Sequence, residues 1–324
     1  MFDSSAHLLI TGGTGFFGLA LLRYWQAMGH AAPRVTVLSR NPVRFKSQHP
    51  DLATIAEWAH GDVLNVESLP FGQRFTHVLH AATDSTFGPQ LTPLERYTQI
   101  VNGTRNVLDL AVSTGATRFL LTSSGGIYGP QPPDMEKIPE SHFCMIDPLI
   151  PNNAYSVAKR SAEHLCVLYQ DRYGLEPIIA RCFAFVGRDL PWDVHFAIGN
   201  FIRDALLFPE IIVNGDGTPV RSYMDQRDLA RWLCTLLANG RAGNAYNVGS
   251  DEGVTINELA HLVRDLLAPE KRVRIGVDPT SQNSRNRYVP SITKARTELG
   301  LTLTHSLQEA IINTAYRSSA PKSK

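Results

Sequence analysis

The stretch Leu8-Leu9-Ile10-Thr11-Gly12-Gly13-Thr14-Gly15-Phe16-Phe17-Gly18 contains a short apolar run, a glycine-rich turn and the start of an amphipathic helix. Gly12 permits a tight turn, Gly15 lets the backbone approach a phosphate closely, and Gly18 lets the helix pack against the strand. Glycines three residues apart also occur in ordinary turns. The apolar run before them and the helix after them favour a pyrophosphate site at the helix N-terminus. The predicted contacts of a dinucleotide cofactor here are Gly12, Thr14, Gly15, Phe16, Phe17 and Gly18.

Segments that resemble strands alternate with helical patterns through the first half of the chain. After the first strand, the predicted strands are residues 35–38, 55–59, 76–80, 117–122 and 177–180, and the clearest helices are 93–114 and 154–173. This alternation predicts parallel pairing and an α/β fold with a Rossmann-type doubly wound sheet. The nucleotide is then expected at the carboxyl ends of the strands.

The pattern changes after about Gly187. Prolines, aromatic residues and short elements dominate 189–221, a regular helix returns at 225–238, and 249–304 mixes short strands and helices. We predict a Rossmann domain at 1–187 plus about 222–248, a smaller C-terminal α/β substrate lobe at 188–221 and 249–316, and a flexible tail at 317–324. A ligand site is expected in the cleft between the two lobes.

Composition excludes several classes of protein. The formal net charge of 324 residues is +1, which gives no electrostatic footprint for nucleic acid or an anionic membrane. No apolar run is long enough to span a membrane, and residues 1–5 do not resemble a signal peptide, so we expect a cytoplasmic protein. Four cysteines without metal-ligand spacing predict free thiols and no metal site: Cys144, Cys166, Cys182 and Cys234.

Tyr155 and Lys159 stand four residues apart in a helical pattern, which puts both side chains on one face. A tyrosine normally ionises near pH ~10, and a nearby ammonium lowers that pKa by favouring the phenolate. The pair can therefore serve as a general acid or base near neutral pH. A tyrosine and a lysine on an ordinary helix surface remain the plainer interpretation of this spacing alone.

Two further polar stretches follow predicted strands. Ser124 comes after the fifth strand, where its hydroxyl can bond a substrate oxygen, although a serine-rich loop explains it as well. Ser39 and Arg40 end the second strand, where an acidic residue would bind the ribose diol of NAD. A hydroxyl and a guanidinium suit a 2′-phosphate instead. We therefore predict NADP(H), with NAD as the other possibility and a merely solvated Arg40 as the plain alternative.

The Gly-x-x-Gly-x-x-Gly turn, the serine and the Tyr-x-x-x-Lys pair together resemble the extended short-chain dehydrogenase/reductase family, also called the NAD-dependent epimerase/dehydratase family. The resemblance covers about residues 8–304, and most members act on nucleotide-linked sugars. It implies catalytic roles for Ser124, Tyr155 and Lys159, the last two also contacting the cofactor. Further cofactor contacts that it implies are Asp62, Val63, His80, Ala81 and Ala82.

The second lobe continues the resemblance. Residues 215–221 match the family's Gly-Asp-Gly-x-x-x-Arg segment, whose arginine binds the diphosphate of a sugar nucleotide, so Arg221 takes that role. Asn200 lies where the family often contacts the diphosphate or base, and Arg287 or Arg285 matches a later arginine segment. Surface charge is the plainer interpretation of an isolated arginine. The implied substrate contacts are Thr83, Ser124, Asn200, Arg221 and Arg287.

This chain differs from the family pattern at several positions, and these differences reduce the number of reactions that we expect of it. The family's 4,6-dehydratases carry Asp-Glu directly after the catalytic residue, where this chain has Gly125 and Gly126, so dehydration is not expected. The family often has asparagine where Ala184 and Ile100 stand, which leaves the pose of the sugar open.

Three functions are compatible with the sequence. The leading prediction is an NADPH-dependent reductase of a nucleotide-linked keto-sugar, with a 4-keto-6-deoxyhexose expected. The alternative is a nucleotide-sugar 4-epimerase with the same three residues, and a remote one is a non-catalytic NADP-binding sensor. The expected partner is a nucleotide diphosphate sugar. The resemblance also implies a homodimer through the helices at 93–114 and 154–173.

Overall fold

The computed structural model describes residues 2–83, 90–143, 146–192, 196–276 and 286–316. Its centre is a sheet of seven parallel strands in the order β11-β6-β5-β4-β1-β2-β3. The order reverses beside β1, which pairs with both β2 and β4, and this confirms the predicted doubly wound α/β fold. The strands are β1 (His7–Thr11), β2 (Arg34–Ser39), β3 (Glu57–His60), β4 (His77–His80), β5 (Arg118–Ser124), β6 (Glu176–Cys182) and β11 (Asn244–Val248).

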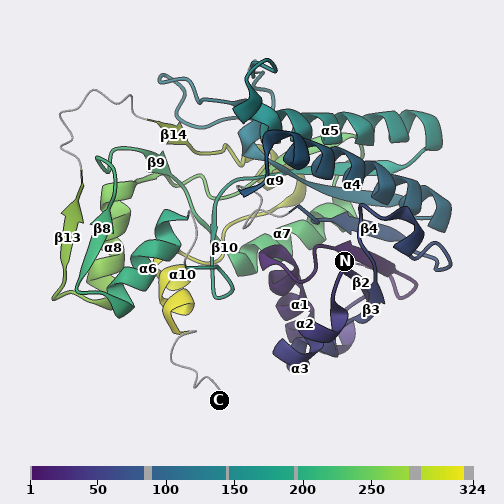
Figure 1. Cartoon of the computed structure of the whole chain (residues 1–324), viewed down its shortest axis with the longest axis horizontal. Coiled ribbons are helices and arrows are strands. Elements are labelled where there is room, and N and C mark those ends of the chain that lie inside the picture. Colours follow the sequence, from purple (N-terminus) through teal and green to yellow (C-terminus); the bar gives the residue numbers. More distant parts are fainter. Residues whose placement is uncertain (1, 84–89, 144–145, 193–195, 277–285, 317–324) are drawn as a thin grey trace.

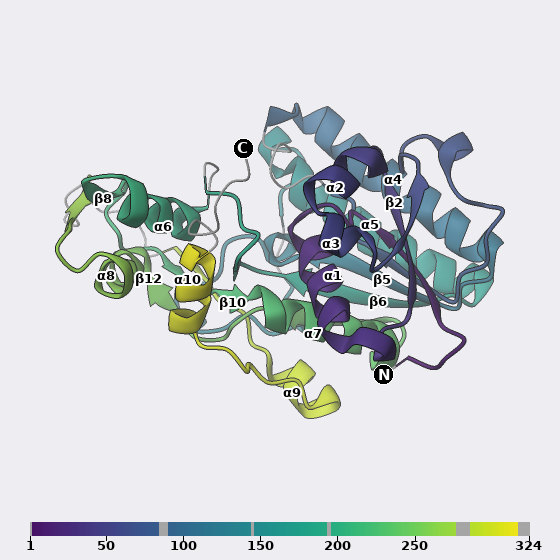
Figure 2. The same ribbon diagram turned by 90° about the horizontal axis from the view of Figure 1, so that it is seen from below.

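Helices cover both faces of this sheet (Figures 1 and 2). Leu8 and Ile10 of β1 join one apolar core with α1 and α7, whereas Leu9 between them joins the other core with α4 and α5. Alternate residues of a strand point to opposite faces, so a strand buried on both sides reads as a continuous apolar run. The helices are α1 (Phe16–Met28), α2 (Pro42–Gln48), α3 (Pro50–Ala53), α4 (Pro93–Thr114), α5 (Ala154–Tyr173), α7 (Gln226–Asn239) and α9 (Thr293–Leu299).

The ends of the two longest helices follow from local sequence. Thr92 and Glu95 form a capping box at the start of α4, with Pro93 at the first helical position. Gly115 and Gly174 end α4 and α5 with left-handed backbone, at φ 80° and 70°. Both helices therefore have the bounds that their sequence patterns predict.

A smaller lobe lies beside the carboxyl side of the main sheet, at the left of Figure 1. Its apolar core gathers the buried faces of α6, α8 and α10 against the parallel pair β8 and β13. A three-stranded sheet, β12-β9-β14, and the pair β10-β7 complete it. Its elements are α6 (Ala197–Leu207), β7 (Phe185–Val186), β8 (Glu210–Val213), β9 (Val220–Arg221), β10 (Met224–Asp225), β12 (Val254–Thr255), α8 (Ile256–Leu267), β13 (Arg272–Ile275), β14 (Arg287–Tyr288) and α10 (Leu307–Ala315).

Some predicted bounds differ from the structure. Short elements are predicted to dominate residues 189–221, and this range also contains α6, a helix of 11 residues whose apolar face packs into the small lobe. The third strand is Glu57–His60 rather than 55–59, because the chain is still turning after α3 at Ile55. Short 3-10 helices are η1 (Gly29–Ala31), η2 (Val66–Ser68), η4 (Gly125–Tyr128) and η5 (Pro151–Asn153).

The described residues include three of the four cysteines, Cys166, Cys182 and Cys234, which are buried free thiols. Cys144 and the predicted tail at 317–324 lie outside the described residues. Within the described ranges, no helix combines the length and apolar character that crossing a membrane requires.

Candidate active site

The glycine turn between β1 and α1 has the shape that a pyrophosphate requires. Gly12 has a left-handed φ of 74°, and a Cβ there would lie 2.3 Å from the carbonyl oxygen of Ala81. A Cβ on Gly18 would lie 2.2 Å from the backbone of Gly13, so α1 packs directly on the turn. Among the described residues beyond its chain neighbours, a Cβ on Gly15 would have the Gly12 oxygen at 3.5 Å as its one contact within 4 Å, which leaves this side open.

The N-terminus of α1 is free to bind an anion. No side chain caps it, and its first turn holds no acidic residue. Its N–H groups and dipole therefore point at the open side of Gly15. Thr14 is exposed beside it, whereas Phe16 and Phe17 hold the helix start against Phe185, with ring centroids 6.5 and 5.2 Å away. These residues fit a dinucleotide cofactor.

The end of β2 presents one fixed and one exposed polar side chain. Ser39 is buried, and its hydroxyl accepts a hydrogen bond of 3.2 Å from the backbone N–H of Asn41. Arg40 is exposed, and in the part of the chain that the structure describes it pairs with no carboxylate. The last residues of β2 therefore carry a positive side chain and no acid of their own.

The turn after β3 is held by its own hydrogen bonds. The Ser68 hydroxyl accepts from the backbone N–H of Asp62 at 2.9 Å, and the Asp62 carboxylate accepts from the N–H of Leu64 at 3.0 Å. Val63 is buried, and its carbonyl accepts from the side-chain amide of Asn106 on α4 at 2.9 Å. Asp62 and Val63 thus stand in a fixed turn next to the end of β2.

The side chain of His80 is buried at the end of β4. Its ring lies between Thr11 at 2.7 Å and Thr104 at 3.3 Å. Burial lowers its pKa to about 3, with a further contribution from the charge of Lys159, so the imidazole is neutral. His80 can therefore offer a cofactor its backbone, whereas Ala81 and Ala82 after it are partly exposed.

Ser124, Tyr155 and Lys159 come together at the carboxyl end of the sheet. Ser124 is the last residue of β5, and its hydroxyl accepts from the Gly126 N–H at 3.0 Å. The same hydroxyl lies close enough to Tyr155 on α5 to lower the pKa of that tyrosine. Lys159, one turn further along α5, donates to the Thr83 hydroxyl at 3.0 Å and the Thr122 carbonyl at 2.8 Å. The predicted residue Thr83 therefore lies in the same cluster.

A second cation lies closer to the Tyr155 ring than Lys159 does. The guanidinium carbon of Arg96 lies 4.2 Å from the Tyr155 ring centroid, whereas the Lys159 nitrogen lies 6.0 Å away. Burial raises the pKa of Tyr155, while the Ser124 hydrogen bond and the charge of Arg96 lower it. Burial lowers the pKa of Lys159 to about 8. Arg96 comes from α4 and belongs to no local motif, so the sequence analysis missed it.

Arg221 lies in the small lobe, at the end of β9. Its guanidinium donates to the backbone carbonyls of Val220 and Asn286, both at 2.9 Å, and pairs with no carboxylate among the described residues. Burial lowers its pKa, and the hydroxyls of Tyr223 and Tyr288 are nearby. A partly buried guanidinium without an acidic partner is suited to an anionic ligand.

The other predicted residues of the small lobe lie in different places. Parallel pairing of β9 with β14 sets Tyr288 beside Arg221 and Arg287 beside Val220, so Arg287 points to the opposite face of this sheet from Arg221. Asn200 lies on α6, where its side-chain oxygen accepts from Arg203 at 3.4 Å. Arg285 lies outside the described residues. Tyr288 is the neighbour of Arg221 that sequence reasoning missed.

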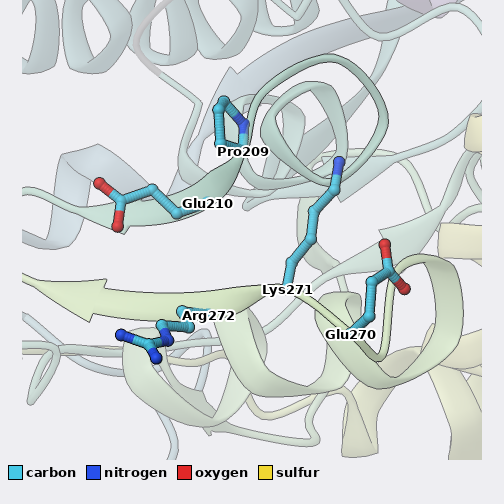
Figure 3. Close-up of a pocket in the computed structure, with 5 residues that line it drawn as sticks. All are labelled: Pro209, Glu210, Glu270, Lys271 and Arg272. Carbon is cyan, nitrogen blue, oxygen red and sulfur yellow. The ribbon is translucent and has the colours of Figure 1, made fainter.

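A separate hollow of about 450 Å³ lies at the edge of the small lobe, between the starts of β8 and β13 (Figure 3). It is lined by two acidic residues, two basic residues and a proline: Glu210, Glu270, Lys271, Arg272 and Pro209. It contains none of the residues discussed above. In the described part of the chain, no group of three or more His, Cys, Asp or Glu side chains is arranged to hold a metal ion.

Comparisons with known proteins agree with this geometry. The model of the NAD dependent epimerase/dehydratase family matches residues 8–249. UDP-glucuronic acid decarboxylase 1 of Danio rerio is 30% identical over 311 residues, which cover 95% of this chain and 71% of the relative. A UDP-glucose 4-epimerase of Thermotoga maritima, solved with UDP-glucose, has a TM-score of 0.83 at 23% identity, with 97% of this chain and 100% of that chain covered. A dTDP-glucose 4,6-dehydratase of Streptomyces venezuelae, solved with NAD, has a TM-score of 0.80 at 27% identity and 97% coverage of both chains.

Proposed function

Because the chain belongs to the NAD dependent epimerase/dehydratase family, we propose that it is an enzyme that acts on nucleotide-linked sugars. The finer proposal is an NADPH-dependent reductase of a nucleotide-linked keto-sugar, with a 4-keto-6-deoxyhexose as the expected substrate. The observation that carries it is the cluster of Ser124, Tyr155 and Lys159 at the end of the sheet that also bears the glycine turn.

Tyr155, Ser124 and Lys159 have different roles in the proposed reduction. A bound nicotinamide supplies the hydride that reaches the carbonyl carbon of the sugar. Tyr155 donates its phenolic proton to the carbonyl oxygen, which completes the alcohol, and solvent then restores the proton to Tyr155. The Ser124 hydroxyl orients the same oxygen. Lys159, fixed by Thr83 and Thr122, is placed to bond the cofactor ribose.

The residues after Ser124 support redox chemistry rather than elimination. Loss of water from a sugar needs a base at one carbon and an acid at the departing hydroxyl. Gly125 and Gly126 provide neither group. The hydroxyls of Ser124 and Tyr155 suit proton transfer at a carbonyl or a carbinol oxygen, which supports the redox proposal.

The cofactor proposal rests on the end of β2. Ser39 and the exposed, acid-free Arg40 suit the 2′-phosphate of NADPH. NADPH supports net reduction. The related dehydratase structure contains NAD, so NAD remains the other cofactor to test.

A second candidate is a nucleotide-sugar 4-epimerase. It would use the same Ser124 and Tyr155, first to oxidise the sugar alcohol and then to reduce the ketone from its other face. The specific observation in its favour is the structural similarity to a UDP-glucose 4-epimerase over 97% of this chain. A non-catalytic NADP-binding sensor is disfavoured, because Tyr155, Lys159 and Ser124 lie together in one cluster.

Arg221 is the proposed anchor of the substrate diphosphate in both cases, with the small lobe as the substrate lobe. Its partly buried, acid-free guanidinium supports this role. The contributions of Asn200 and Arg287 stay predictions. Since Arg287 faces away from Arg221, it would have to reach the ligand from the other side of the β9–β14 pair.

The function can be tested with a panel of nucleotide-linked sugars. The protein is incubated with NADPH and 4-keto-6-deoxyhexoses linked to different nucleotides, and loss of nicotinamide absorbance is followed. UDP-glucose and UDP-glucuronic acid, each with NAD, test epimerisation and decarboxylation. Reduction of a keto-sugar supports the proposal. Turnover of only the UDP-sugars with NAD would contradict it.

We also propose a homodimer through α4 and α5. Apolar side chains stand exposed on these helices, among them Leu94 at 74%, Val167 at 49% and Leu168 at 47% exposure. Burying such a face between two copies is a common basis of two-fold dimers. Light scattering at micromolar concentration should give the mass of a dimer, and a clean monomer mass would contradict it.

A further inference from the structure

We propose that Tyr288 is a further substrate-binding residue, whose hydroxyl holds the sugar between the diphosphate anchor Arg221 and the Ser124–Tyr155 pair. This inference rests on the proposed function, since it places a nucleotide-linked sugar in the same site. Tyr288 comes from β14 of the small lobe, far in sequence from every motif of the reaction centre.

Strand register directs Tyr288 toward the site. β14 pairs in parallel with β9, and Tyr288 is the partner of Arg221 in that pair. Partnered residues of neighbouring strands project to the same face of a sheet. The phenol and the guanidinium therefore leave the β9–β14 pair side by side, and the Tyr288 hydroxyl lies in the electrostatic environment of Arg221.

The ring of Tyr288 is fixed in place. It stacks on Phe183, with ring centroids 4.6 Å apart and planes 32° apart. Its hydroxyl reaches the end of β5, close enough for the Ser124 hydroxyl to lower the pKa of Tyr288 against the larger effect of burial. A Cβ on Gly125 would lie 2.5 Å from this oxygen and 2.7 Å from the Phe183 ring. The Tyr288 hydroxyl thus occupies the space that a side chain at position 125 would fill.

The hydrogen-bonding capacity of Ser124 links the two tyrosines. A serine hydroxyl has one donor and two acceptor positions. One acceptor position takes the Gly126 N–H at 3.0 Å, which leaves one donor and one acceptor for Tyr155 and Tyr288. Tyr288 is neutral, because burial raises its pKa. It can therefore both donate to and accept from a sugar hydroxyl over the working pH range.

The arrangement fits a sugar nucleotide rather than a bare nucleotide. Arg221 meets the diphosphate, Ser124 and Tyr155 meet the reacting oxygen, and Tyr288 stands between these two points. A ligand that ends at its diphosphate reaches Arg221 and stops short of Ser124. Only a ligand that continues into a hexose extends past Tyr288.

Arg221 is proposed to bind the diphosphate and Tyr288 the sugar, and calorimetry with UDP and UDP-glucose in the presence of NADP+ tests this difference. If the uridine ligands do not bind, the measurement is repeated with dTDP and dTDP-glucose. Tyr288→Phe keeps the ring and its stacking but removes the hydroxyl. We expect it to weaken the sugar nucleotide about 3–10-fold, the size of one neutral hydrogen bond, and to leave the bare diphosphate unchanged. Arg221→Ala should weaken both ligands equally. Tyr24→Phe, which removes a partly buried hydroxyl from α1, is the matched control and should change neither.

A second variant tests the contact itself. Gly125→Ala should displace the Tyr288 hydroxyl and weaken the sugar nucleotide, and its effect should be smaller when Tyr288 is already phenylalanine. Equal sugar-nucleotide affinity in the native protein and in Tyr288→Phe would overturn the inference, and so would additive effects of the two changes. If the native protein binds neither pair of ligands, the proposed function fails and the inference fails with it. If the native protein binds the sugar nucleotide and Tyr288→Phe does not change that affinity, the inference fails but the proposed function stands.

Discussion

The two halves of the candidate site are held in different ways. At the end of the main sheet, Lys159 is buried and donates to Thr83 and Thr122, and Ser124 is locked by the Gly126 N–H. In the small lobe, Arg221 lies on a two-residue strand, and its recorded partners among the described residues are backbone carbonyls. A side chain with several buried partners keeps one geometry, whereas a guanidinium that bonds two carbonyls still has N–H donors for a ligand. This difference supports the proposed division, in which the first region carries out the reaction and the second provides affinity.

The largest effect is expected at the reacting oxygen. Tyr155→Phe removes the proton donor and little volume, so turnover should fall about 10²–10⁴-fold. NADPH affinity, measured by fluorescence titration, should survive. Near-normal turnover in this variant would remove Tyr155 from the mechanism and break the division between the two regions.

The matching change in the small lobe should act on binding instead. Arg221→Ala loses a charge-assisted contact worth about 1.5–3 kcal/mol, so the nucleotide sugar should bind roughly 10–100-fold more weakly. NADPH affinity should not change. A large loss of NADPH binding in this variant would show that the two regions are not separate.

Cofactor preference should change by a smaller factor. Arg40→Ala should weaken NADPH up to roughly fivefold, because Arg40 is exposed and surface charge pairs contribute about 0.2–1 kcal/mol. NADH affinity should stay constant. Equal affinities of the unaltered protein for NADPH and NADH would count against the proposed 2′-phosphate site.

The smallest effect concerns the pH profile. Arg96 favours the Tyr155 phenolate, so Arg96→Met should raise the pKa of Tyr155 further. Reduction needs the protonated phenol, and the alkaline fall in kcat should therefore move to higher pH. Arg96→Lys retains the charge and serves as the control. An unchanged profile in Arg96→Met would leave Lys159 as the tuning cation.

The sequence predicts the first region well because its determinants are local. Gly12, Gly15 and Gly18 lie within one turn, and Tyr155 and Lys159 lie one helical turn apart, so spacing alone sets their relations. The α/β class and the bounds of α4 and α5 follow from equally local patterns of periodicity and capping. The roles assigned to these residues remain predictions.

The second region depends on contacts between distant segments. Tyr288 lies near Ser124 because β14 pairs with β9. The spacing of residues within either strand does not determine that register. Arg96 reaches Tyr155 because α4 packs beside α5. This contact lies between two helices, and the sequence of neither helix determines the distance between them.

The central claim is net reduction of a keto-sugar at the Tyr155 centre, and isotope transfer tests it most directly. The protein is incubated with a nucleotide-linked 4-keto-6-deoxyhexose and NADPH that carries deuterium at both C4 positions of the nicotinamide. Mass spectrometry and nicotinamide absorbance are read on the same sample. The account predicts one deuterium in each product sugar and one NADPH consumed per product. In a parallel sample that contains the corresponding nucleotide-linked 4-hydroxy sugar, a change of configuration with no deuterium gained and no net loss of NADPH would contradict it and establish the epimerase.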